Sequence, residues 1–191
     1  MPGLRFTWML RYQGWAFCTI ADDHGQAEAI ASDITYGPED LLAAVTSIAQ
    51  GAATARAEFE GEPTAFRWFF KRDGTHTEIR LVKAPDRDSP DSEGSVIWSG
   101  RHSIDALARA ILAAFHQAVS DLGSDNYRAQ WGRPFPASHI ETLQIAAQKI
   151  AEDQQTLSAG QTRFVAIRLE SLDRCSSAAA SWSPGRRSTP G

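Results

Sequence analysis

The chain has 191 residues, of which 42% are hydrophobic and 22% are charged, and its formal net charge is −4 at pH 7. These fractions are typical of a globular protein, and a chain of this length buries more of its surface if it keeps a single core. Acidic and basic residues are interspersed along it, which argues against a nucleic-acid-binding protein, because such proteins usually carry a basic excess.

Neither a membrane span nor a secretion signal is expected. No apolar run approaches the roughly 20 residues that a transmembrane helix needs, and Arg11 interrupts an N-terminal apolar segment too short for a signal peptide. We therefore predict a cytoplasmic protein with no membrane contact. Cys18 lies in an apolar run and Cys175 opens a polar one, so we expect two free thiols, one buried and one exposed.

The first predicted elements are two strands and a helix. Residues 14–21 are rich in aromatic and β-branched side chains, and residues 27–34 can return as a weaker second strand after a turn. Pro38 suits the first position of a helix, whose apolar positions continue at helical spacing until Gly51. Residues 53–60 then alternate between apolar and polar side chains, which is typical of a strand with one wet face.

Residues 66–82 give the clearest local pattern, a β-hairpin in which Asp73-Gly74 is the expected two-residue turn. This turn fixes the cross-strand pairs on both faces. On the apolar face the predicted pairs are Phe66 with Leu81, Trp68 with Ile79 and Phe70 with Thr77. On the polar face the predicted pairs are Arg67 with Arg80, Phe69 with Glu78 and Lys71 with His76.

The second half of the chain predicts helices. After a surface loop over 84–94 and a short strand over 95–99, Ser103 caps a long amphipathic helix over 104–122. Ser138 and Glu141 form a capping-box pattern for a third helix.

Hairpin-joined strands followed by helices indicate an α+β fold. We expect an antiparallel sheet of five to six strands with two or three helices packed on one face, a two-layer sandwich. The predicted organisation is a single domain over 1–151, an uncertain C-terminal extension over 152–174 in which residues 162–172 can form a strand, and a disordered tail over 175–191.

Catalytic and metal-binding motifs are not found. The five histidines form no close ligand pair, and no nucleophile elbow or phosphate-binding loop occurs. His102 and Asp105 can meet at the start of the long helix, but Asp105 is explained by the positive helix end. We therefore expect no catalytic residue, no metal and no cofactor, and we favour a protein that is not an enzyme.

The polar face of the hairpin is the first candidate site. Arg67 opposite Arg80 is unfavourable unless a negative group lies nearby. Either Glu58 or Glu78 neutralises this set, or the face receives an acidic partner with an aromatic anchor in its centre. The candidate partner-binding residues are Arg56, Arg67, Phe69, Lys71 and Arg80.

The second candidate site is a proline-bearing connection that contains Tyr127, Trp131 and Phe135. These aromatic side chains either close one end of the core, since aromatic residues bury large areas, or line a pocket for a peptide or small ligand.

These segments together resemble a known group of proteins. The segments are Gly14-Trp15-Ala16, the hairpin that begins Phe66-Arg67-Trp68, the long helix, and the stretch from Tyr127 to Pro136. The chain resembles, over roughly residues 10–150, a group of small uncharacterised bacterial cytoplasmic proteins. The resemblance implies the same α+β layout and no activity, and the residues beyond about Leu157 depart from it.

Two functions from different classes follow. The first is a non-enzymatic protein-interaction module, of the immunity or accessory type, that binds a protein partner through a sheet face. The alternative is a small-ligand-binding protein or small hydrolase-like enzyme with a pocket between sheet and helices, which needs His102, Asp105 or His139 near Trp131 and Phe135. A single-stranded nucleic acid stacked on Phe69 ranks third.

Overall fold

The computed structural model describes residues 3–156 of the chain. The chain divides into a compact unit, Met1–Ile150, and a second part, Ala151–Gly191, of which only the helical residues 151–156 are described. The possible strand over 162–172, the tail over 175–191 and most of the extension over 152–174 lie outside the described residues. The predicted domain boundaries therefore stay predictions.

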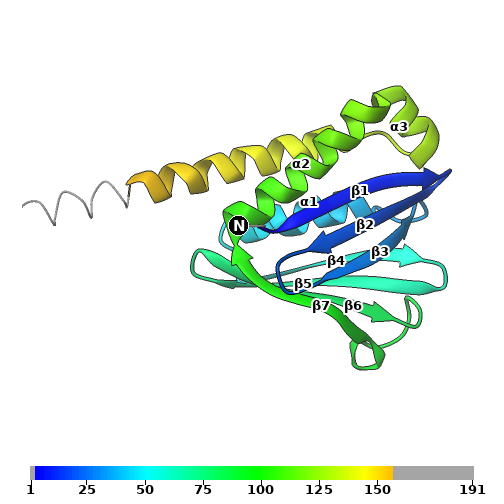
Figure 1. Ribbon diagram of the computed structural model, residues 1–191, viewed down its shortest axis with the longest axis horizontal. Coiled ribbons are helices and arrows are strands. Elements are labelled where there is room, and N and C mark those ends of the chain that lie inside the picture. Colours follow the sequence, from blue (N-terminus) through cyan, green and yellow to red (C-terminus); the bar gives the residue numbers. More distant parts are fainter. Residues whose placement is uncertain (1–2, 157–191) are drawn as a thin grey trace, which may run out of the picture. The chain divides into compact units, whose positions relative to one another are not determined.

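The strands form two antiparallel sheets (Figure 1). The three-stranded sheet has the order β1-β2-β3 and consists of β1 (Arg5–Tyr12), β2 (Trp15–Ala21) and β3 (Gln26–Ser32). The four-stranded sheet has the order β4-β5-β6-β7 and consists of β4 (Thr54–Gly61), β5 (Thr64–Asp73), β6 (His76–Ala84) and β7 (Ser95–Ser103). Within each sheet, every strand thus pairs with its neighbour in sequence, as hairpin connections require.

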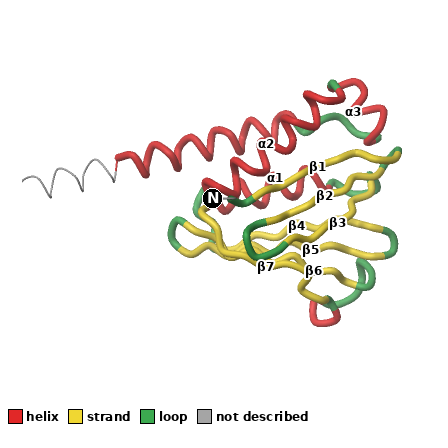
Figure 2. The backbone as a smooth tube through the Cα atoms, in the orientation of Figure 1, coloured by secondary structure: helices red, strands yellow, loops and turns green. Residues whose placement is uncertain are grey.

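The helices lie in the connections and after the last strand (Figure 2). Helix α1 (Gly37–Ala49) joins the two sheets, and α2 (Ile104–Leu122) and α3 (Ser124–Trp131) follow β7. A short 3-10 helix, η1 (Asp91–Glu93), lies in the β6–β7 loop, and residues 137–156 are helical. Helix α1 packs mainly on β4 and α2 mainly on β1, so each sheet has a helix against it.

The α+β class and the antiparallel pairing are confirmed, but the prediction of one sheet of five to six strands is wrong. Strands β3 and β4 are the adjoining edges of two separate sheets. They come close where Gly61 lies beside the carbonyl oxygen of Ile30, yet no ladder joins them in the described part of the chain. Helix α1 separates the two strands in sequence and packs against β4, which leaves part of the β4 edge beside a helix.

Strand β1 is an element that the expected series, which begins at residue 14, omits. Its side chains alternate regularly, with Phe6, Trp8 and Leu10 buried and the residues between them exposed. This period-two pattern is a strand signal in its own right. Strand β1 pairs with β2 along nearly its whole length and supplies the apolar row that contacts α2.

Aromatic side chains from both sheets meet in a single core. Trp8 of β1 lies 5.8 Å from Phe59 of β4 and 5.3 Å from Phe115 of α2, measured between ring centroids. Phe6 of β1 lies 5.9 Å from Trp68 of β5. Since each ring of this kind buries a large apolar area, these contacts bind the two sheets and α2 into one packed unit.

The hairpin of β5 and β6 forms as predicted, but its register differs by two residues. Asp73 pairs with His76, so the turn residues are Gly74 and Thr75 and not Asp73 and Gly74. Gly74 has a φ of 59°, which glycine adopts without strain at the first position of such a turn. Trp68 consequently faces Leu81 and not Ile79. A shift of two residues keeps every side chain on its face, so the predicted apolar face is nevertheless buried.

The predicted start of α2 is confirmed, whereas the predicted start of the helix over 137–156 is not. The Ala106 amide donates a 3.1 Å hydrogen bond to Oγ of Ser103, which confirms Ser103 as the cap of α2. The predicted capping box at Ser138 and Glu141 is wrong, because the helix already begins at residue 137 and Ser138 lies inside its first turn. Pro136 precedes that start and its carbonyl accepts from the Ile140 amide.

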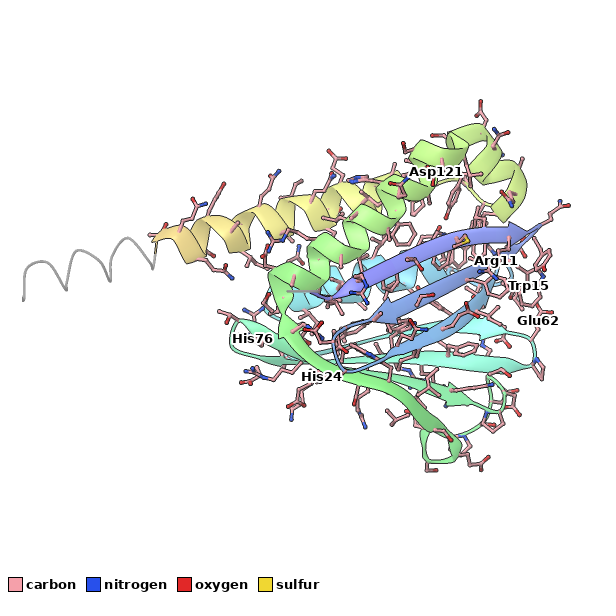
Figure 3. The ribbon with its side chains drawn as sticks, in the orientation of Figure 1. Arg11, Trp15, His24, Glu62, His76 and Asp121 are labelled. Carbon is pink, nitrogen blue, oxygen red and sulfur yellow. The ribbon has the colours of Figure 1, made fainter. Side chains whose placement is uncertain are left out.

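One end of the three-stranded sheet is closed by close backbone contacts to α3. The Gly14 amide donates a 2.7 Å hydrogen bond to the carbonyl of Gln130, and the Asp33 amide donates a 2.9 Å bond to the carbonyl of Gly14. Figure 3 shows Arg11 and Trp15 at this end and His24 and His76 at the other. The two glycines that touch Asp33, Gly14 and Gly132, both have positive φ.

Candidate functional site

The exposed face of the four-stranded sheet carries a row in which a phenylalanine is flanked by two arginines. The register places Arg56 of β4 opposite Phe69 of β5, and Phe69 opposite Arg80 of β6. Directly paired residues project from the same face of a sheet. The predicted pair of Arg67 with Arg80 is therefore wrong, because the shifted hairpin register sets Arg67 opposite Val82.

Both guanidinium groups of this row lie over the Phe69 ring. The Cζ atom of Arg56 lies 5.2 Å from the ring centroid, and the Cζ atom of Arg80 lies 5.3 Å from it. These distances are within the range of a cation–π interaction. The ring is half-buried, so part of its surface stays open to solvent beside the two arginines.

A hollow of about 580 Å³ surrounds this ring. Its lining residues are Thr54, Ala55, Arg56, Phe69, Phe70, Lys71, Glu78 and Arg80. Four of the five predicted partner-binding residues thus line one hollow, and Arg67 is the exception. We refer to this feature as the Phe69 hollow. The sequence did not single out Thr54, Ala55 or Phe70, which are ordinary strand residues without an unusual pattern.

The charge of the Phe69 hollow is mainly positive. It has three basic side chains and one acidic one, Glu78, whose carboxylate lies 3.9 Å from Nζ of Lys71. Arg56 is already engaged, with Glu58 at 3.1 Å and Asp91 at 3.2 Å. No ion pair is found for Arg80 among residues 3–156, so its charge is the one most available to a ligand.

Arg67 has a structural environment. Its side chain is 3% exposed and all of its guanidinium nitrogens donate. Nε bonds to Glu58 at 2.8 Å, Nη1 bonds to Asp91 at 2.8 Å, and Nη2 bonds to the carbonyl of Arg87 at 2.8 Å. The expectation that Glu58 neutralises this face is thereby correct for Arg67, and the arginine ties the β6–β7 loop to the sheet.

The second predicted site forms part of the core. Tyr127 and Trp131 lie in α3, where the sequence predicted an irregular connection, and both are 0% exposed. Phe135 is partly buried, and its ring packs edge-on against Tyr127 with centroids 5.1 Å apart. Burial raises the pKa of the Tyr127 hydroxyl well above its ordinary value. These aromatic side chains close one end of the core, which is the first of the two interpretations.

His102 and Asp105, which were considered together for catalysis, have separate partners. Nε2 of His102 lies 3.0 Å from Oδ2 of Asp22, and Asp105 forms an ion pair with Arg109 one helical turn further on. His102 and Asp105 thus do not bond to each other. Within the described residues, no group of three or more His, Cys, Asp or Glu side chains is arranged to hold a metal ion. Cys18 is buried and unbonded, and burial raises its pKa well above the ordinary value; Cys175 lies outside the described residues.

Comparisons with family models, with curated proteins and with solved structures find no match for this chain. The resemblance to small bacterial cytoplasmic proteins therefore stays a prediction. No helix among residues 3–156 combines the length and the apolar character that crossing a membrane requires.

Proposed function

We propose that this protein is a non-enzymatic interaction module, of the immunity or accessory type, that binds an acidic segment of a protein partner in the Phe69 hollow. The observation that carries this proposal is the row Arg56–Phe69–Arg80 on an exposed sheet face. Arginine and aromatic side chains are enriched among the residues that contribute most to protein interfaces.

The chemistry of the hollow favours a carboxylate-bearing partner. Arg80 offers a planar guanidinium that can bind a carboxylate through two parallel hydrogen bonds, and Lys71 adds a mobile positive charge beside it. The exposed part of the Phe69 ring supplies an apolar contact between them. A partner segment with an acidic residue next to an apolar one satisfies all three side chains. We place this interaction in the cytoplasm.

Capture from native cell lysate tests the proposal. The tagged protein is compared with its Phe69→Ala and Arg80→Glu variants at low and at high salt, and the captured proteins are identified by mass spectrometry. We expect one stoichiometric acidic partner on the wild-type protein, less of it at high salt because exposed charges are screened, and little on either variant.

A matched control separates a local effect from an effect of overall charge. Lys149→Glu makes the same change of charge on the exposed face of a helix outside the hollow, and it should capture the partner as well as the wild type does. Equal capture by the wild type and Arg80→Glu would contradict the proposal. So would capture of nucleic acid that Phe69→Ala abolishes, since that outcome identifies the face as a stacking platform.

A further inference from the structure

The edge of β4 away from β5 has no ladder partner; it adjoins β3 near Gly61 and borders α1 toward Thr54. Strand β4 is the first strand of the order β4-β5-β6-β7, so β5 is its ladder partner and its other edge is unpaired. The Arg72 amide donates a 2.8 Å hydrogen bond to the carbonyl of Ala53. In an antiparallel ladder the bonded pairs alternate, so the backbone groups of Thr54, Arg56 and Glu58 point away from β5. No hydrogen bond from the described part of the chain reaches these groups.

A groove runs along this edge between β4 and α1. It has a volume of about 730 Å³. Its lining residues are Asp40, Ala43, Ala44, Ser47, Ala52, Thr54, Ala55, Arg56, Ala57 and Glu58. Five of these are alanines and one is serine, so small side chains form most of the wall between α1 and β4.

The groove also has an acidic side chain, that of Asp40. Asp40 projects from the first turn of α1 and forms no ion pair with another residue of the described chain. Partial burial and the nearby carboxylate of Glu58 raise the pKa of Asp40, while His139 lowers it. A positively charged side chain placed here would stabilise the ionised carboxylate.

We infer that the β4 edge receives an extended segment of a protein partner as an additional strand, with a lysine or arginine of that segment opposite Asp40. Edge addition derives its affinity from main-chain hydrogen bonds and its specificity from alternate side chains. Here the main-chain groups are those of Thr54, Arg56 and Glu58, and the side-chain selection comes from Asp40.

This inference deepens the proposed function and relies on that function for the identity of the partner. The groove and the Phe69 hollow share Thr54, Ala55 and Arg56. Alternate side chains of an added strand would lie beside Arg56 on the exposed face, in line with Phe69, and the others would point toward α1. One extended segment can therefore place acidic residues at the hollow and a basic residue in the groove.

A displayed library of random short peptides, selected on the intact chain, tests strand addition directly. We expect the selected peptides to be extended sequences that carry a lysine or arginine and to protect the amides of Thr54, Arg56 and Glu58 from hydrogen exchange. Thr54→Pro removes one edge N–H at the first residue of the strand, where proline is tolerated. It should weaken binding at least about tenfold, because it removes one hydrogen bond and obstructs the edge.

Three further variants separate the possible failures. Thr54→Ala keeps the N–H and should bind like the wild type, which shows that the side chain is not the cause. Asp40→Asn should lower the affinity for peptides with a basic residue and leave other peptides unaffected. Phe69→Ala should leave intact the binding of the peptide's lysine or arginine in the groove. If Phe69→Ala is the only variant that loses peptide binding, the result supports the hollow and contradicts the added strand.

Three further outcomes would overturn the inference. One is a peptide set that binds Thr54→Pro and the wild type equally well. Another is a selection in which no peptide binds the wild type more tightly than Thr54→Pro. This outcome counts only if urea unfolding shows that Thr54→Pro is folded. If that variant is unfolded, Ala43→Leu replaces it, because it fills the groove from the exposed side of α1. The third is protection of the β4 amides in the free protein together with a dimer by light scattering, which assigns the edge to a second copy.

Discussion

Oδ2 of Asp22 and Nε2 of His102 lie 3.0 Å apart, although 80 positions separate them in the sequence. Asp22 belongs to the turn between β2 and β3, and His102 belongs to β7, so this contact joins the two sheets at the end opposite to α3. Oδ1 of Asp22 also accepts from the amides of His24 and Gly25, at 2.8 and 3.1 Å. The Asp22 carboxylate is thus held by three donors.

This contact makes stability depend on pH. Burial alone would raise the pKa of Asp22, but the hydrogen bonds outweigh burial and hold the pKa below its ordinary value of 3.8. The folded protein therefore binds this proton less tightly than the unfolded chain, and the contribution of Asp22 is present above pH 3.8 and lost as the pH falls below it. Asp22→Asn should lower the free energy of unfolding by about 1–2 kcal/mol at pH 7.

Urea unfolding at neutral and at acidic pH measures this effect. The difference between the wild type and Asp22→Asn should shrink once the pH falls below the depressed pKa. Asp23→Asn, a change at the exposed neighbour, should behave like the wild type at both pH values. A difference for Asp22→Asn that is the same at every pH would show that the loss comes from packing and not from the charge.

Replacing Arg67 should destabilise the protein. Arg67→Met removes three hydrogen bonds and leaves the partly buried Glu58 carboxylate with fewer partners, so we expect a loss of about 2 kcal/mol in the free energy of unfolding. Arg80→Met, on the same sheet face, should change it by less than about 0.5 kcal/mol. Limited proteolysis should also cut the β6–β7 loop faster in Arg67→Met, and unchanged cleavage would mean that the arginine does not hold the loop.

Gly132 should not tolerate a side chain. Its φ is 89°, and a Cβ atom at this position would collide with the carboxylate of Asp33. Gly132→Ala should therefore cost more than about 1 kcal/mol, from backbone strain and from displacement of Asp33. Gly25→Ala is the matched control, since nothing lies within 4 Å of its added Cβ. Thermal unfolding of both variants checks this, and equal melting temperatures would contradict it.

Trp131 distinguishes a core position from a ligand pocket. Its ring is 0% exposed and packs edge-on against Trp8 at 5.5 Å. Trp131→Ala should lower the free energy of unfolding by about 3–5 kcal/mol. Phe69→Ala should cost clearly less, since its ring is only half-buried. A Trp131→Ala variant that keeps its stability would revive the pocket hypothesis, and a screen of small ligands would then follow.

Four residues of the Phe69 hollow were predicted to share one sheet face, for a simple physical reason. Successive side chains of a strand point to opposite faces of the sheet, so a register error of two residues does not change the face of any side chain. Arg56, Phe69 and Arg80 therefore remained on one face. The same error gave wrong direct partners. Asp73-Gly74 is the more usual turn pair, but in the structure Gly74 is the first turn residue and Asp73 pairs with His76.

Arg67 was misplaced because its partners are distant in sequence. Asp91 lies 24 positions away, in a loop whose composition predicts only exposure to solvent. No local pattern indicates that this loop folds back over the sheet and buries the guanidinium group. The contact of Asp22 with His102 was missed for the same reason. So was the groove beside β4, because its walls come from a helix and a strand that only the tertiary fold brings together.

The separation of the strands into two sheets was likewise beyond the sequence. Hairpins predict which neighbouring strands pair, and all of those pairs formed. Whether β3 also pairs with β4 depends on the path that the chain takes through α1 between the two strands in sequence, and no local signal records that path. Strand β1, by contrast, has a regular alternation and was predictable.

The aromatic cluster gives the protein its own optical probes. Trp8, stacked on Phe115 at an interplanar angle of 28° and meeting Trp131 at 76°, is held in a fixed, asymmetric and nearly dry environment. Such an arrangement produces a strong near-ultraviolet circular dichroism signal that vanishes when side-chain packing is lost, even if the helices and strands remain. The chain thus reports loosening of its core without any attached dye.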